Sequence, residues 1–181
     1  NDNSFALIGA PDADRDSNAD RGAAYVYTQT GGTWSAVSEL TPSISEAGQS
    51  YGTAVAIEGS VAAIAAPNAG GVGAVFVFRE NGGTWTEDQV IVPATDDTTT
   101  YGLGVDIALA DGRLIVGASS GTAYVYTEIS STFVLTETIN VSGVTAADRF
   151  GSSVAITSDY ASIGAFRRSN NGSRSGEAFV F

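Results

Sequence analysis

The sequence predicts an all-β chain built from a repeated unit, and three observations support this prediction. Short sequence signatures recur in the same order along the 181 residues. Within them, β-branched and small residues alternate with period two, which is typical of strands that bury one face. No stretch shows convincing helical periodicity.

The first signature pairs an aromatic residue with glycine ahead of an alternating segment. It reads YGTAVAI from Tyr51, YGLGVDI from Tyr101 and FGSSVAI from Phe150, with starts 50 and 49 residues apart. We treat these three aromatic residues as equivalent. The small residues beside them would let the innermost strands of neighbouring units pack closely around a central axis.

Three more signatures follow in each unit. The second is ALIGAP, AAIAAP, LIVGAS or ASIGAF; the third is GAAYVY, GAVFVF, GTAYVY or GEAFVF; the looser fourth is GGTWSAV, GGTWTED or SSTFVLT. Short turns separate them. Four short antiparallel strands in a unit of roughly 50 residues describe a β-propeller blade, whose faces are buried only by its neighbours. Packing therefore explains the motifs without any chemistry.

The unit boundaries predict a single propeller domain, or part of one, over residues 1–181. The units span about 1–50, 51–100, 101–149 and 150–181, or about 3.5 blades, because the first lacks its innermost strand and the last its outermost. The chain is then either a piece of a longer propeller or is completed by another copy, since an open blade exposes unpaired backbone. Head-to-tail completion would give a closed ring or a filament.

The combination of Tyr/Phe-Gly, Gly-Ala-Pro and Gly-x-Ala-Tyr-Val-Tyr resembles the FG-GAP repeat of integrin α-chain-like β-propellers, especially the bacterial secreted and surface type. The chain departs from that pattern where Ala65 replaces the Gly of Gly-Ala-Pro and where Ser119 and Phe166 replace its Pro. The resemblance implies the propeller fold. It leaves function open, because such propellers serve in adhesion, ligand binding and scaffolding.

Composition excludes several functions. The chain has no Cys, Met, His or Lys, and eight Arg against twenty acids give a net charge of −12. Disulfides, Cys/His zinc sites and Ser-His-Asp triads are excluded. Nucleic acid is not an expected partner, because phosphate binding needs a basic surface. No apolar run is long enough for membrane insertion. A Lys-free acidic surface fits an extracellular or cell-surface location.

The stretch DADRDSNAD places carboxylates at Asp12, Asp14, Asp16 and Asp20, a spacing found in calcium-binding loops. Ca²⁺ is the only cofactor that the sequence suggests. Ser17 stands where such loops carry Gly, and the predicted loop joins the second and third strands of its unit, whereas the integrin calcium loop joins the first and second. The alternative is a solvated acidic loop with Asx turns.

The corresponding loop of the fourth unit is basic, with Arg167, Arg168 and Arg174. It either meets the acidic loop, within the chain or on a neighbouring copy, or is simply solvated. Asn140 and Asn171 lie in N-glycosylation sequons.

The leading functional prediction is a non-enzymatic extracellular structural or adhesive module that self-assembles head to tail by completing open blades between copies. The alternative is a ligand-binding propeller that recognises a glycan or protein through loops at one end, in a calcium-dependent manner if the acidic loop binds the ion. A two-carboxylate hydrolase is a third hypothesis. Asp106, on a predicted innermost strand, is its only candidate residue, and the alternative role for Asp106 is to line a wet channel.

Overall fold

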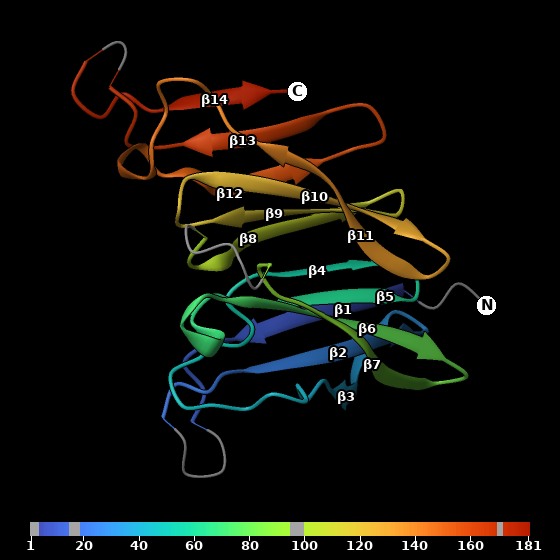
Figure 1. Ribbon diagram of the computed structural model, residues 1–181. Helices are drawn as coiled ribbons and strands as arrows, with labels where there is room; N and C mark the ends of the chain where they lie inside the picture. The colour runs from blue at the N-terminus through green and yellow to red at the C-terminus, as the bar shows by residue number, and fades with distance from the viewer. Residues whose placement is uncertain (1–3, 15–18, 95–99, 170–171) are drawn as a thin grey trace.

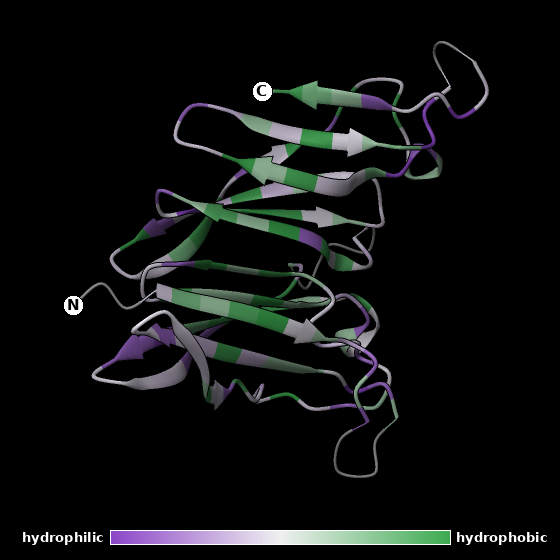
Figure 2. Ribbon diagram, turned by 180° about the vertical axis from the view of Figure 1, so that it is seen from behind, coloured by the Kyte–Doolittle hydropathy of each residue, from purple (hydrophilic) through white to green (hydrophobic). Residues whose placement is uncertain are grey.

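The computed structural model describes residues 4–14, 19–94, 100–169 and 172–181. These residues form four antiparallel sheets stacked face to face, with no α-helix in the part described (Figure 1). Hydrophobic residues run along the strands inside the stack, and hydrophilic residues gather in the hairpins and connecting loops (Figure 2). The predicted all-β fold is confirmed, with sheets compatible with part of a propeller.

Strands pair in chain order within every sheet. The first sheet contains β1 (Ser4–Ala10), β2 (Ala23–Thr30) and β3 (Thr33–Glu39); the second contains β4 (Val55–Glu58), β5 (Val61–Ala66), β6 (Ala74–Asn81) and β7 (Thr84–Ile91). The third contains β8 (Leu103–Ala110), β9 (Arg113–Ala118), β10 (Thr122–Ile129) and β11 (Thr132–Ile139); the fourth contains β12 (Phe150–Ile156), β13 (Ala161–Ala165) and β14 (Glu177–Val180). Short 3-10 turns, η1 (Ala69–Gly71) and η2 (Ala146–Asp148), lie in the connections.

The hydrophobic core consists of three layers, one between each pair of adjacent sheets. Between the first and second sheets, Tyr51 packs edge-on against Phe76 with ring centroids 5.4 Å apart, and Phe5 packs in the same way on Trp85. Between the third and fourth, Phe150 packs on Phe179 at 5.5 Å. The second and third sheets therefore each supply one face to the layer before them and the other face to the layer after them, whereas the first and fourth sheets supply one face each.

The equivalence of Tyr101 with Tyr51 and Phe150 is wrong by two residues. Tyr101 is 51% exposed, whereas Leu103 is 1% exposed and lies in the core. Leu103 forms a parallel bridge with Gly73, just as Tyr51 does with Gly22. Leu103 therefore fills the aromatic position of the third unit.

Backbone geometry confirms this shifted register. The residue ahead of the buried side chain is left-handed in the second, third and fourth units, with φ of 55° at Ser50, 62° at Gly102 and 60° at Arg149. The carbonyl of Tyr101 accepts a hydrogen bond from the N–H of Ser120. The carbonyl of Asp148 accepts the equivalent bond from the N–H of Arg167. Tyr101 thus corresponds to the residue two positions before the buried aromatic.

Glycines of the first two signatures lie where strands of adjacent sheets approach each other closely, as β9 and β12 do. We use the name inner strands for those that carry these two signatures: β1, β4, β5, β8, β9, β12 and β13. A Cβ added to Gly9 would lie 2.0 Å from the carbonyl oxygen of Gly52, and one added to Gly117 would lie 1.9 Å from that of Gly151. No side chain fits at such distances. These glycines are therefore packing requirements, as the sequence predicted.

Candidate interaction surfaces

The outward face of the first sheet carries side chains at positions that the other sheets bury. Trp34 on β3 is 46% exposed, whereas Trp85, at the same position of the second sheet, is 8% exposed. Ile8 on β1 is likewise exposed, and its equivalents Ile64 and Ile163 are fully buried. Each later sheet buries these positions against the sheet before it. The first sheet therefore leaves exposed a face that the other sheets bury.

The outward face of the fourth sheet is the counterpart. Val180 is 67% exposed, whereas Val26 and Val77 at the equivalent positions are fully buried. Its neighbours on this face are small, with Ser162 opposite Val180 and Ala178 opposite Gly164. The stack therefore ends in a bulky apolar face on one side and a shallow face on the other.

Hydrogen bonds from side chains hold adjacent sheets together beyond the apolar layers. The Gln89 amide on β7 donates to the carbonyl of Phe133 on β11 and accepts from its N–H, both at 2.9 Å. Arg79 donates to the carbonyl of Ser131 at 2.9 Å and pairs with Glu128, also at 2.9 Å. The Gln89 contacts join the outermost strands β7 and β11, and the Arg79 contacts join β6 to β10 and to the turn that follows it.

Asp106, the candidate residue of the hydrolase hypothesis, makes a contact of the same kind between inner strands. One carboxylate oxygen accepts the N–H of Ile107 at 3.0 Å, and the other accepts the N–H of Val154 at 2.7 Å. Val154 lies on β12 of the next sheet. Both carboxylate oxygens thus accept hydrogen bonds from backbone N–H groups. Asp106 therefore has a structural function that the amino-acid sequence did not predict.

The predicted calcium loop is described only in part. Asp12, Asp14 and Asp20 are exposed, and Asp16 lies outside the described residues. The Asp14 carboxylate accepts the backbone N–H of Asp20 at 3.1 Å, a local contact that fits the solvated acidic loop. No three carboxylates gather around a common point within the described ranges. Calcium binding by the four aspartates stays a prediction.

The structure describes one of the two predicted N-glycosylation sites. Asn140 directly follows β11, is exposed, and accepts a hydrogen bond from the Thr122 hydroxyl at 2.9 Å. Asn171 lies outside the described residues. Glycosylation of either stays a prediction.

The arginines of the basic loop in the fourth unit have different partners. Arg168 contacts the carboxylates of Asp148 at 3.4 Å and Glu177 at 3.5 Å. Hydrogen bonds from the backbone and hydroxyl of Thr145, together with Arg168, hold the pKa of Asp148 below its ordinary value. Arg167 instead lies over the ring of Phe166, 5.5 Å from its centroid.

Comparison with known proteins agrees with the geometry. A family model described as FG-GAP repeat matches residues 34–78 and 134–181, just over half of the chain. No curated protein matches the sequence. Within the described residues, no helix has the length and apolar character needed to cross a membrane.

Proposed function

Because the chain belongs to the FG-GAP repeat family, we propose that it is a non-enzymatic extracellular or cell-surface module that associates head to tail, in a structural or adhesive role. One observation carries this proposal. The apolar positions that bury each sheet against its predecessor are exposed on the first sheet, at Ile8 and Trp34. A second copy, through its fourth sheet, is the occupant that this face fits.

The three internal layers support the choice of occupant. In each of them, a face equivalent to that of Ile8 and Trp34 packs on a face equivalent to that of Val180. Burying one large apolar side chain stabilises an interface by about 1.5–3 kcal/mol. The small residues beside Val180 leave room for the bulky side chains of the other face. A heterologous contact of this type repeats from copy to copy.

Charge supports the same arrangement. The loop after β1 carries the exposed carboxylates Asp12 and Asp14, and the equivalent loop after β13 carries Arg167. Both loops leave the stack on the same side (Figure 1). Head-to-tail stacking would bring the acidic loop of one copy beside the basic loop of the next, which favours association and fixes its register.

Sedimentation velocity on three samples tests the proposal: the unmodified chain, Ile8→Asp and Val180→Asp. We expect the unmodified chain to associate as its concentration rises, because both faces are intact. Each variant alone should stay monomeric, because a charge is placed on one face. An equimolar mixture should form a one-to-one dimer and stop, since each variant retains the face that the other has lost.

Ile129→Asp is the matched control, because Ile129 is an exposed apolar residue at the end of β10, away from both end faces. It should associate like the unmodified chain. Dimers formed by Val180→Asp alone would show that two copies of the first sheet meet each other. A monomer at every concentration of the unmodified chain would overturn the proposal. The alternative function, recognition of a glycan or protein through loops, stays a prediction.

A further inference from the structure

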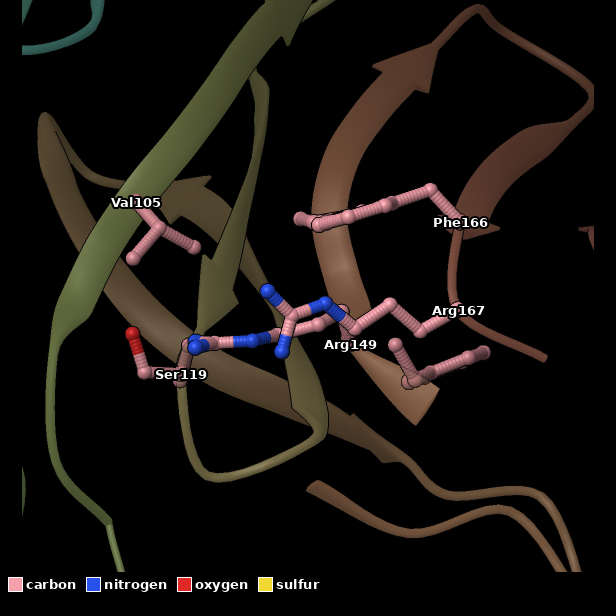
Figure 3. A pocket seen from close by; sticks show the side chains of 8 residues that line it. Val105, Ser119, Arg149, Phe166 and Arg167 are labelled. Carbon is pink, nitrogen blue, oxygen red and sulfur yellow. The ribbon is translucent and has the colours of Figure 1, made fainter. Parts of the chain in front are cut away.

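A pocket of about 180 Å³ lies where the inner strands of the third and fourth sheets meet (Figure 3). Its walls are largely apolar, with Val105 on β8, Phe150 at the start of β12 and Phe166 after β13. Ser119 adds a hydroxyl at the far side. Arg149 and Arg167 complete the lining, and Figure 3 shows their guanidinium groups pointing into the pocket toward Ser119.

Neither of these guanidinium groups forms an ion pair with a described residue, although the chain carries a net charge of −12. The lining contains no acid. Their neighbour Arg168 is paired with two carboxylates. Two like charges in one partly apolar pocket repel each other, and a bound anion would remove that repulsion.

The repeat shows that the scaffold does not require arginine at either position. Arg149 corresponds to Gly102 and Ser50, which share its left-handed backbone. Arg167 corresponds to Ser120, because both donate their N–H to the residue two positions before the buried side chain of the unit. Arginine is in fact costly at a left-handed position, where glycine is favoured. The pair is therefore a specialisation of this one sheet boundary.

We propose that this pocket binds an organic carboxylate that carries an apolar group. The planar guanidinium fork matches a carboxylate with two parallel hydrogen bonds, and such charge-assisted bonds are among the strongest in proteins. The apolar walls formed by Phe150, Phe166 and Val105 suit a hydrocarbon or aromatic substituent and offer nothing to a fully hydrated inorganic anion. Two sources supply this chemistry: a small free acid and the carboxyl terminus of a peptide.

Titration followed by ¹H–¹⁵N NMR tests the proposal. The probes are N-acetyl-phenylalanine, its neutral amide N-acetyl-phenylalaninamide, and sulfate. We expect saturable shifts of the Ser119, Arg149 and Arg167 amides with the acid, and affinity at least about tenfold weaker for the amide and for sulfate, because each lacks one of the two recognised features. A tripeptide ending in phenylalanine distinguishes the sources: tighter binding than the single residue identifies a chain end, and equal or weaker binding a small free acid.

Arg149→Gln and Arg167→Gln should each weaken binding of the acid about tenfold or more while leaving the spectrum otherwise unchanged. Arg174→Gln is the matched control, because Arg174 is an exposed arginine outside the pocket lining. Equal affinity for acid and amide, equal affinity for sulfate, or unchanged binding by both pocket variants would overturn the proposal. So would the absence of shifts at tens of millimolar acid. Arg167 also lies in the loop that head-to-tail stacking would bring beside the acidic loop of another copy, so all titrations are carried out in the Val180→Asp background, in which the fourth-sheet face is disrupted. The result then does not depend on whether the chain associates head to tail.

Discussion

Replacement of Asp106 by asparagine tests how neighbouring inner strands are held together. Asparagine keeps the shape of the side chain but offers only one oxygen as acceptor. Its amide nitrogen cannot accept the N–H of Ile107 or that of Val154, the two donors that the carboxylate now satisfies. One of these half-buried donors is then left facing another donor.

The expected cost follows from the contact to Val154, which at 2.7 Å is the shorter of the two. A hydrogen bond to a charged acceptor contributes about 1.5–3 kcal/mol. We therefore expect Asp106→Asn to lower the free energy of unfolding by about 1.5–3 kcal/mol, with the lower end favoured because water reaches part of the site. Urea unfolding, extrapolated to zero denaturant, measures it.

Glu137→Gln provides the matched control, because Glu137 is an exposed acid on β11 of the same sheet. It removes one negative charge from a chain of net charge −12 without breaking a contact between sheets. Glu137→Gln should leave the free energy of unfolding unchanged or raise it slightly. If Asp106→Asn costs less than about 0.5 kcal/mol relative to it, the carboxylate is not the tie between sheets that its geometry indicates.

Three further predictions concern other parts of the chain. Hydrogen bonds from Thr145 lower the pKa of Asp148 from its ordinary value of 3.8, so the ionised carboxylate contributes its full stabilisation above about pH 4–5 and loses it as pH falls below 3.8. The difference in melting temperature between the unmodified chain and Asp148→Asn should therefore shrink as pH falls through that range. A difference that stays constant contradicts the prediction. Gly117→Ala places a Cβ against the Gly151 carbonyl and should cost about 1–3 kcal/mol or more in urea unfolding; a neutral effect would mean that the inner strands separate easily. If the acidic loop binds calcium with a Kd near 10 µM, 1 mM calcium should raise the melting temperature by roughly 5–10 °C, and Asp14→Ala should abolish the shift; overlaid curves with calcium and with chelator identify a surface loop.

The fold was largely predictable because the repeat encodes it locally. Period-two alternation in segments such as AAYVY and AVFVF predicts strands, and short turns between them predict antiparallel pairing in chain order. The register of the third unit was not predictable from the aromatic signature alone. Tyr101 and Leu103 both precede glycine, and only tertiary packing decides which of them enters the core. An available signal was the distance to the end of the second signature: Leu103 stands 16 residues before Ser119, as Tyr51 stands before Pro67 and Phe150 before Phe166, whereas Tyr101 stands 18 before Ser119.

The site residues were harder to predict, for a physical reason. Arg167 belongs to a basic loop that the sequence makes evident, whereas Arg149 is an isolated arginine before a buried aromatic and carries no local pattern. The two meet only because the start of β12 and the end of β13 lie together at one sheet boundary. The sequence makes Asp106 a candidate through its charge and its place on an innermost strand, yet its partner Val154 is 48 residues away along the chain. Contacts of that range depend on the stacking of sheets.

Each internal layer uses the same positions on the two sheets that it joins, and this regularity has a consequence for how such chains change in length. A duplicated unit inserted beside its original would keep the native contact on one side and, on the other, would pack through the same positions that the existing layers use. Insertion or deletion of a whole unit therefore demands no new core. Part of a unit, by contrast, would leave an apolar face without its partner. Variation among related chains should accordingly come in whole repeats, with differences in surface chemistry confined to the loops between strands.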